Sequence, residues 1–274
     1  MSKFYDALEV AKRSDKKQPE HRSNPVFEFG EKRTPTFTEE LVVLNDPDSE
    51  ISECFRFLRS LIAYPVEGHM PRTIMITSAL LGEGKTFVAT NLAASISQGI
   101  EEHVLLIDAD LRRPRTHKVF GLPDKNEGLS SYLSKNTPLS DLLIKTAVDK
   151  LTILPAGNST EIPAELLSST KMKTLIQEVE SRYEDRLVII DSSPLEMTSE
   201  SSVISKYVDA VILVVRYGKT PRHCVRDAIE RIPKEKLLGI VFNANKKRLR
   251  RYGGYKYGYG FGYGYGYGKK DKGQ

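Results

Sequence analysis

Short apolar runs alternate with longer mixed stretches between about residue 40 and residue 245, and this alternation predicts the fold. Several of the runs are rich in Val and Ile, and helical stretches lie between most of them. Near-continuous apolar strands separated by helices are typical of a mainly parallel sheet that is covered by helices on both faces. We therefore predict an α/β domain with strands at Ile74–Thr77, Val104–Asp108, Leu151–Leu154, Leu187–Asp191, Ala210–Val215 and Leu237–Asn243.

Three of these strands end in residues that can bind phosphate or metal. Thr77, Asp108 and Asp191 each stand at the carboxyl end of a predicted strand. Ligands of open α/β sheets bind beyond the carboxyl ends of the strands, so we expect these three groups to converge on one site.

The two ends of the chain lack the alternating pattern. Residues 4–13 have the composition of a short helix, and residues 13–35 are polar, aperiodic and contain proline, which is typical of a linker. After Asn245 the sequence becomes basic and then alternates Tyr with Gly, a low-complexity pattern without a continuous apolar face. We predict an N-terminal helix and linker (1–39), a folded domain (40–245) and a disordered tail (246–274).

The formal charge of +5 is concentrated in the tail. Residues 246–274 hold nine Lys or Arg and one Asp, for +8, which leaves 32 basic and 35 acidic residues, or −3, for the rest. Only the tail is therefore a candidate for contact with an anionic membrane or nucleic acid.

No apolar run approaches the ~18 to 20 residues that cross a bilayer, and the first residues lack the apolar segment of a signal peptide. We expect a cytosolic chain. The two cysteines, Cys54 and Cys224, have no metal-site spacing, so we expect reduced and buried thiols.

A phosphate-binding loop is predicted directly after the first strand. Residues 78–86 read SALLGEGKT, and a helical stretch follows from 87 to 97. The loop matches G-x-x-x-x-G-K-[ST] except that Ala79 occupies the first glycine position. Backbone N–H groups of such a loop face phosphate oxygens, its lysine reaches the β- and γ-phosphates, and its hydroxyl binds Mg²⁺. The alternative is an ordinary strand-to-helix turn with a solvated lysine. The predicted nucleotide-contacting residues are Leu81, Gly82, Glu83, Gly84, Lys85, Thr86 and Phe87.

Acidic side chains follow two further strands. Asp108, Asp110 and Arg112 stand together after the second strand, and Asp191 ends the fourth. Paired carboxylates hold Mg²⁺ or accept a proton, and P-loop NTPases hold Mg²⁺ with one Asp after an apolar strand. The alternative for the first group is a helix N-cap with a local ion pair.

The ordered set of motifs resembles the bacterial tyrosine kinases, a family of P-loop autokinases distinct from eukaryotic protein kinases. The likeness rests on the GEGKT form of the Walker A loop and on the DxDxR Walker A′ motif, and it covers roughly residues 50 to 245. Further family-like sequence is Arg113-Pro114, His117-Lys118, Phe120–Leu122, Gly128–Ser130, Tyr132-Leu133, Pro155–Gly157 and Pro163–Leu167.

The resemblance implies a P-loop fold of the deviant Walker type, shared with positioning ATPases, that binds ATP and Mg²⁺. It implies a metal site of Thr86, Asp108 and Asp191. The implied catalytic residues are Lys85, Asp108, Asp110 and Arg112. Asp108 resembles the family's base more closely, and Asp110 stays open as the alternative.

The resemblance also implies ATP-dependent autophosphorylation of the tail between subunits. The tail holds seven of the chain's 13 tyrosines. These predicted acceptors are Tyr252, Tyr255, Tyr257, Tyr259, Tyr263, Tyr265 and Tyr267.

Two smaller motifs complete the resemblance. Glu53, Arg56 and Arg59 match the family's EX₂RX₂R motif on one face of a helix, which implies assembly of a homo-oligomeric ring; the alternative is a solvated helix stripe. Asn243 resembles the asparagine that reads adenine in this superfamily, and its alternative is a turn residue.

The implied partners are a separate membrane-spanning activator of the polysaccharide chain-length type and a protein-tyrosine phosphatase. Recruitment to the inner face of the cell membrane and control of exopolysaccharide or capsule synthesis and export are implied with them, and nucleic acid is not expected as a partner. The chain departs from the family's D-x-P-P pattern, because Ser193 precedes Pro194 where a first proline is usual.

Two other classes stay open. A positioning ATPase shares the fold and would bind membrane or DNA through the tail, but such proteins carry an early lysine in the loop where this chain has Leu80. A scaffold would instead bind single-stranded nucleic acid through the stacking and charge of its Tyr/Gly/Arg tail.

Overall fold

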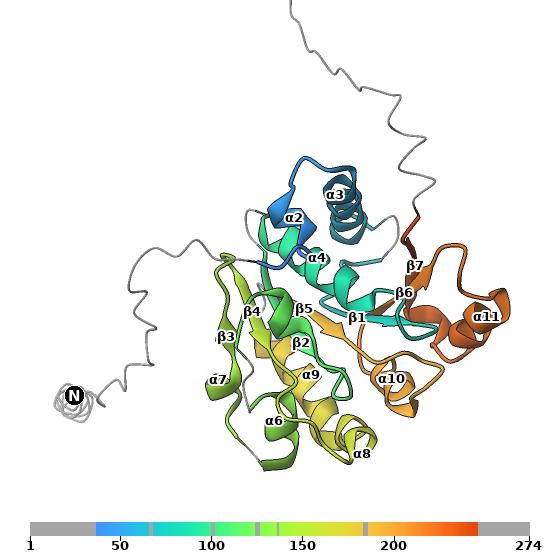
Figure 1. Ribbon diagram of the computed structural model, residues 1–274. Coiled ribbons are helices and arrows are strands. Elements are labelled where there is room, and N and C mark those ends of the chain that lie inside the picture. Colours follow the sequence, from blue (N-terminus) through green and yellow to red (C-terminus); the bar gives the residue numbers. More distant parts are fainter. Residues whose placement is uncertain are drawn as a thin grey trace, which may run out of the picture. The chain divides into compact units, whose positions relative to one another are not determined.

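One sheet organises the described part of the chain, which comprises residues 37–65, 68–99, 102–123, 127–135, 137–182 and 186–245 of a computed structural model. Its seven strands lie in the order β3-β4-β2-β5-β1-β6-β7 (Figure 1). All pairs are parallel except β3 with β4. The strands are β1 (Thr73–Ser78), β2 (His103–Asp108), β3 (Ile144–Lys145), β4 (Leu151–Leu154), β5 (Arg186–Asp191), β6 (Ala210–Arg216) and β7 (Leu237–Asn243).

The six predicted strands are confirmed, each within one residue of its expected ends. The sequence reading missed β3, because two residues on the edge of a sheet carry no periodic signal. The mainly parallel α/β fold is likewise confirmed.

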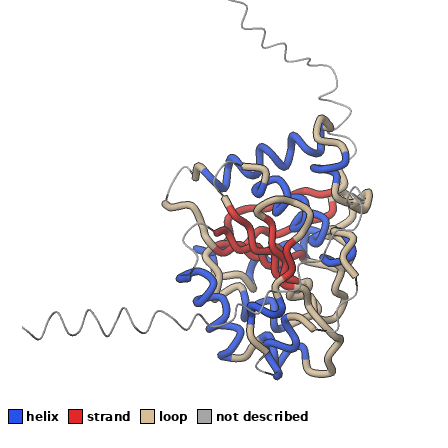
Figure 2. Tube along the Cα trace, turned by 90° about the vertical axis from the view of Figure 1, so that its left-hand side faces the viewer, coloured by secondary structure: helices blue, strands red, loops and turns tan. Residues whose placement is uncertain are grey.

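Helices cover both faces of this sheet (Figures 1 and 2). One face is covered by α2 (Val42–Asn45), α3 (Glu50–Ala63), α4 (Lys85–Ser97) and α5 (Thr116–Val119). The other is covered by α6 (Leu129–Lys135), α7 (Leu139–Leu142), α8 (Pro163–Leu167), α9 (Thr170–Arg182), α10 (Ser199–Ile204) and α11 (Arg222–Glu230). A 3₁₀ turn, η1 (Lys234–Lys236), leads into β7.

Side chains along the central strands alternate between two apolar cores. Met75 of β1 belongs to the core that includes α9, whereas its neighbours Ile74 and Ile76 belong to the core that includes α4. This period of two, with both sides buried, is why the strands read as continuous apolar runs.

Helix α4 is buried along most of its length and holds the phosphate loop in place. Each residue from 88 to 97 is buried, and α3 packs over the helix. Buried Asn91 accepts a hydrogen bond from the Val43 N–H (3.1 Å) and donates one to the Glu40 carbonyl (2.8 Å). The first described residues are thereby attached to the core. The helix begins at Lys85, two residues before the predicted start.

The expectation of buried thiols is wrong. Cys54 is exposed and Cys224 is half-buried, and both are free. Cys54 lies on the outward stripe of α3 with the exposed Phe57 and Leu61, and helical spacing puts these three residues on one face.

No described helix has the length and apolar character required to cross a bilayer. The predicted helix at residues 4–13, the linker that follows and the whole tail lie outside the described residues.

Candidate active site

The carboxyl ends of three adjacent strands meet at one place. Strands β2, β5 and β1 are neighbours in the sheet, Asp108 is in register with Asp191, and Asp191 is in register with Ile76. The phosphate loop therefore begins two residues beyond the position that faces Asp191, and the three predicted groups come from neighbouring strands.

The phosphate loop needs glycine at two positions with left-handed backbone. The φ angles are 73° at Gly82 and 91° at Gly84. A Cβ at Gly84 would lie 2.0 Å from Nδ2 of Asn243, whereas a Cβ at Gly82 would meet nothing within 4 Å. Helix α4 starts directly after Gly84, so its first N–H groups and the positive end of its dipole are available to an anion.

Glu83 stabilises this loop from inside. Its side chain is buried, and Oε2 accepts a hydrogen bond from the Leu80 N–H at 2.9 Å. Oε1 accepts one from the hydroxyl of Thr220 in the loop after β6. Because the Glu83 side chain is bonded within the protein, the predicted nucleotide contact of this residue falls to its backbone N–H. No sequence pattern pointed to Thr220.

The side chains of Leu81 and Phe87, also predicted near nucleotide, point to different surroundings. Leu81 is exposed. The Phe87 ring instead packs edge-to-face on Phe55 of α3, with ring centroids 5.8 Å apart.

Lys85 and Asp110 form an ion pair at the centre of the site. Nζ of Lys85 lies 2.8 Å from Oδ2 of Asp110, and both side chains are largely buried. Burial by itself would raise the pKa of Asp110. The charge of Lys85 and hydrogen bonds from Lys85, Arg113 and Ser193 outweigh it and hold that pKa below its ordinary value. Asp110 is therefore ionised at neutral pH.

Asp108 is fully buried and already bonded to the protein. Its Oδ2 accepts hydrogen bonds from the Arg115 N–H (3.1 Å), the Thr116 N–H (3.1 Å) and the Thr116 hydroxyl (2.8 Å). Burial raises the pKa of Asp108, and these hydrogen bonds offset only part of the rise. The carboxylate thus binds the backbone at the start of α5, although the N-cap residue of that helix is Arg115. Its Oδ1 accepts a hydrogen bond from the Asp110 N–H at 3.2 Å.

Asp191 is the carboxylate that fits a metal ion. Both of its oxygens are buried, and neither has a hydrogen bond of normal geometry. Burial raises its pKa to about 8, with Lys85 acting against the rise and Asp108 adding to it; the nearby Thr86 hydroxyl lowers it slightly. An unpaired buried carboxylate is costly, and a divalent cation would relieve that cost.

A magnesium ion needs few protein ligands, because it keeps several waters and binds substrate phosphates. The described residues contain no cluster of three or more His, Cys, Asp or Glu that could hold a metal by itself. Asp191 beside Thr86 suits Mg²⁺ that arrives with a nucleotide.

Two side chains without a recognised motif complete the site. The Ser193 hydroxyl donates to Oδ1 of Asp110 at 3.0 Å. Nε of Arg112 lies 3.0 Å from Oε1 of Glu200, which is buried in the first turn of α10, and Oε2 of Glu200 has no partner. Sequence reasoning missed Glu200 because it comes 88 residues after Arg112.

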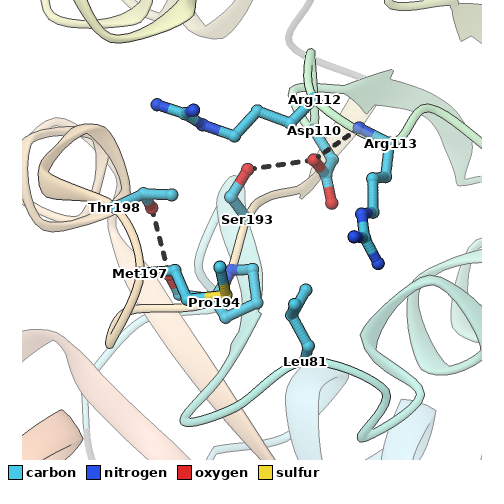
Figure 3. Close-up of a pocket in the computed structure, with 8 residues that line it drawn as sticks. All are labelled: Leu81, Asp110, Arg112, Arg113, Ser193, Pro194, Met197 and Thr198. Carbon is cyan, nitrogen blue, oxygen red and sulfur yellow. Dashed lines mark hydrogen bonds between the residues drawn. The ribbon is translucent and has the colours of Figure 1, made fainter.

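A pocket opens beside Asp110, and Figure 3 shows the residues that line it. Arg112 and Arg113 follow Asp110 in sequence, and in Figure 3 their guanidinium groups extend to opposite sides. The lining residues come from the phosphate loop, the loop after β2 and the loop after β5; they are Leu81, Asp110, Arg112, Arg113, Ser193, Pro194, Met197 and Thr198.

Asn243 lies against the phosphate loop at the end of β7. Its Nδ2 donates to the Glu83 carbonyl (2.8 Å), and its Oδ1 accepts from the Ala244 N–H (2.8 Å). Both ends of the amide are therefore bonded within the chain. Its role in adenine recognition stays a prediction.

The three residues of the predicted ring motif differ in their surroundings on α3. Arg56 binds Glu53, with Nη2 2.6 Å from Oε2, and also donates to the Pro47 carbonyl at 2.8 Å. Arg59 instead points toward the core side and donates to the Ser95 carbonyl of α4 at 2.6 Å. The motif is thus not a uniform outward stripe. The seven predicted acceptor tyrosines lie outside the described residues.

Comparison with known proteins finds relatives in sequence and in structure. Residues 71–236 match a family model described as an AAA domain. The tyrosine-protein kinase YwqD of Bacillus subtilis (strain 168) is 35% identical over 219 residues, which cover 79% of this chain and 90% of YwqD. Two solved structures are similar as well. The kinase domain of Escherichia coli tyrosine kinase ETK has a TM-score of 0.71 and 28% identity, covering 78% of this chain and 83% of that one. The chimerical protein CapA2B2 has a TM-score of 0.68 and 34% identity, covering 74% and 89%.

Proposed function

Since this chain belongs to the bacterial tyrosine-protein kinases, we propose that it transfers the γ-phosphoryl group of ATP to the tyrosines of its own tail, mostly between neighbouring subunits. The observation that supports this most directly is the Lys85–Asp110 ion pair beside the unpartnered carboxylate of Asp191. A phosphate-binding cation at the start of α4 thereby lies beside two carboxylates from the ends of neighbouring strands, one suited to accept a proton and one suited to bind a metal.

Each group has a distinct task. Lys85 and the N–H groups of the phosphate loop neutralise charge that develops on the γ-phosphoryl oxygens. Thr86 and Asp191 would hold Mg²⁺, which supplies further charge neutralisation when bound. Ser193 and Lys85 orient the two oxygens of Asp110.

The transfer needs a base, because a phenol has a pKa near ~10. The tyrosine proton passes to a carboxylate oxygen of Asp110 or Asp108. A bond forms between the phenolic oxygen and the γ-phosphorus, the bond from that phosphorus to the β,γ-bridging oxygen breaks, and ADP leaves with the electron pair. We favour Asp110, because it lines the pocket that opens beside the phosphate loop, whereas Asp108 is fully buried and does not line that pocket.

The tail is long enough to reach a neighbour. Tyr267 comes 21 residues after Lys246, and a fully extended chain of about that length spans ~70 Å. Each phosphate adds about −1.5 to −2, so seven would add roughly −10 to −14 against the tail charge of +8. Phosphorylation would therefore reverse the charge of the tail and weaken a ring or membrane contact that depends on it.

We extend the proposal to the biological setting on the strength of the family alone. The chain would assemble as a ring, act at the inner face of the membrane with a separate membrane-spanning activator, and be reset by a protein-tyrosine phosphatase. Its output would be control of exopolysaccharide or capsule synthesis.

The direct test is incubation with ATP and Mg²⁺ followed by mass spectrometry of the C-terminal peptide. Wild-type chain should gain phosphate on tail tyrosines, and Lys85→Met should gain none. Release of inorganic phosphate without labelling of the chain would instead favour a positioning-type ATPase.

A further inference from the structure

The pocket beside Asp110 has two kinds of wall. Leu81, Pro194 and Met197 form apolar sides, while Asp110 and Ser193 form a polar end (Figure 3). The polar end carries the carboxylate that pairs with Lys85. A group that enters the pocket therefore arrives at the same ion pair that would hold the γ-phosphate, on a side reached through the loops after β2 and β5.

Two of the apolar walls are exposed to water. Leu81 is 40% exposed and Met197 is 59% exposed, although both stand among charged groups. Large apolar side chains that face water beside a charged site gain free energy when a flat apolar group covers them. A methionine suits an aromatic ring well, because its side chain adapts in shape and its sulfur attracts the ring edge.

Arg113 supplies a free cation at the rim. Its backbone N–H bonds Oδ1 of Asp110 at 3.1 Å, whereas its guanidinium has no hydrogen bond or ion pair with any described residue. Arg112 differs, because Glu200 engages its Nε. A planar guanidinium without a partner can stack on an aromatic ring and then bind two oxygens of a phosphate.

We propose that this pocket is the acceptor site: Leu81, Pro194 and Met197 grip the phenol ring of a tyrosine that lies between glycines, and Arg113 binds the phosphate after transfer. This proposal rests on the kinase function proposed above and adds the residues that select the acceptor. The phenol oxygen lies at the polar end, where Asp110 accepts its proton as the γ-phosphoryl group is transferred.

The apolar walls account for two preferences, one for tyrosine as the acceptor and one for glycine on both sides of it. The side chains of serine and threonine are shorter than that of tyrosine and carry no ring, so they would leave the apolar walls uncovered. Glycines on both sides of the tyrosine bring no Cβ against these protruding side chains. Four tail tyrosines have glycine on both sides, namely Tyr259, Tyr263, Tyr265 and Tyr267. They should be modified faster than Tyr252, Tyr255 and Tyr257, which each have a basic neighbour.

The test uses the full-length chain with its seven tail tyrosines changed to serine, so that an added peptide is the substrate. The probe is a synthetic peptide of residues 258–268 in which Tyr263 is kept and the other aromatic residues are serine. Initial rates at varied peptide concentration give KM and kcat, and ATP affinity is measured separately on each variant.

Met197→Ser should raise the peptide KM roughly tenfold, as expected when about half of a methionine side chain is no longer buried by the ring. It should leave kcat and ATP affinity unchanged, and Met197→Leu should restore the KM. Leu238→Ser is the matched control and should change nothing, since Leu238 is 43% exposed at the start of β7, whereas the site lies beyond the carboxyl ends of the strands. A peptide with valine in place of both flanking glycines should also show a raised KM.

Arg113→Gln provides an independent measurement. The phosphorylated peptide should inhibit the parent chain, and the variant should need roughly tenfold more of it, since a charge-assisted contact to phosphate is lost. In the contrary outcome, the parent chain phosphorylates the peptide while Met197→Ser keeps the parent KM and Arg113→Gln keeps the parent inhibition by phosphopeptide. That result would overturn the acceptor pocket but leave the proposed kinase function intact. If the wild-type chain labels neither the peptide nor its own tail, the proposed function itself is wrong.

Discussion

The hydroxyl of Ser193 donates a 3.0 Å hydrogen bond to Oδ1 of Asp110, and Ser193 occupies the position of the first proline in the D-x-P-P pattern. A proline has no donor for this bond. The other oxygen of Asp110 is held by Lys85 at 2.8 Å, so this chain fixes both oxygens of one carboxylate. The departure from the family pattern is therefore a difference in how the carboxylate is oriented.

Replacing Ser193 by alanine should lower kcat for tail labelling about threefold to tenfold, which corresponds to one lost hydrogen bond to a charged group. The Ser193 bond lowers the pKa of Asp110, so its loss should shift the acidic limb of the pH–rate profile toward higher pH. Ser193→Thr keeps the hydroxyl and should stay near the wild-type profile. A profile for Ser193→Ala that coincides with wild type would exclude this role.

Glu200 should matter to activity more than to stability. Glu200→Gln keeps the shape of the side chain but removes its ion pair with Arg112. Because a buried carboxylate with one unpartnered oxygen is costly, neutralising it should leave the thermal midpoint within a few degrees of wild type. Arg112 then loses its fixed position, and kcat should fall roughly tenfold.

The control for Glu200→Gln is Glu165→Gln, which removes a carboxylate from the exposed surface of α8. Glu165→Gln should change neither the thermal midpoint nor kcat. A Glu200→Gln chain that unfolds at far lower temperature would mean that the pair mainly stabilises α10 against the loop after β2.

The sheet and the convergence of charged groups could be predicted from the sequence, because both depend on local patterns within single strands and the residues that follow them. Strands buried on both faces must be apolar throughout, and parallel strands bring their carboxyl ends to one edge, so Asp108, Asp191 and the loop before Lys85 could be placed together. Side-chain partners could not be placed, because they depend on how the segments pack. Glu200 and Thr220 are far from their partners in sequence and belong to no motif.

The sequence also could not predict which way a long side chain on a helix points. The spacing of Glu53, Arg56 and Arg59 suggested one face, but a long arginine side chain can bend toward a carbonyl of the helix beneath it, as Arg59 does at Ser95. Cys54 was expected inside because cysteine is commonly buried, yet its helical position put it on the outer stripe of α3.

Asp191 should make the stability of the chain without ligands depend on pH. Its pKa is raised from 3.8 to about 8 by burial, so the folded state holds a proton that the unfolded state releases at lower pH. This contribution is fully present below about pH 4 and is lost as the pH rises through about 8. Thermal unfolding of wild type and Asp191→Asn should therefore differ most in slope between these values, with wild type declining more steeply.

Mg²⁺ and nucleotide should reverse this trend, because binding a cation requires ionised Asp191. The rise in midpoint that MgATP gives to wild type should be larger at pH 8 than at pH 6, and Asp191→Asn should show little of it. Equal slopes for the two chains without ligand would contradict the assignment of the raised pKa to Asp191.

The two glycines of the phosphate loop should differ in their tolerance of a methyl group. Both have positive φ, so alanine costs about 1 kcal/mol or more at either position. At Gly82 the new Cβ meets open space, whereas at Gly84 it would lie 2.0 Å from Nδ2 of Asn243. ATP affinity should fall roughly fivefold for Gly82→Ala and roughly a hundredfold for Gly84→Ala.

A second substitution separates the backbone strain at residue 84 from the steric clash with Asn243. Gly84→Ala combined with Asn243→Ala removes the amide that the new Cβ would meet, so affinity should recover in part, down to the cost of the backbone strain and of the lost Asn243 bond. Isothermal calorimetry measures the affinity of an ATP analogue for wild type, Gly84→Ala, Asn243→Ala and the double variant. The four affinities give the coupling free energy between the two positions. No recovery in the double variant would show that backbone strain alone disables Gly84→Ala.

Helix α3 offers a test that separates assembly from folding. Arg59 donates a hydrogen bond to the Ser95 carbonyl of α4, so Arg59→Ala should lower the thermal midpoint by about 5 °C. It should also weaken any subunit contact that uses α3. Phe57 is 64% exposed on the same helix, and Phe57→Ser should leave the midpoint within about 1 °C. If the outer face of α3 joins subunits, light scattering should show a smaller mass for both variants. An unchanged mass for Phe57→Ser would place the subunit contact elsewhere, and loss of mass in Arg59→Ala alone would then report a loosened α3.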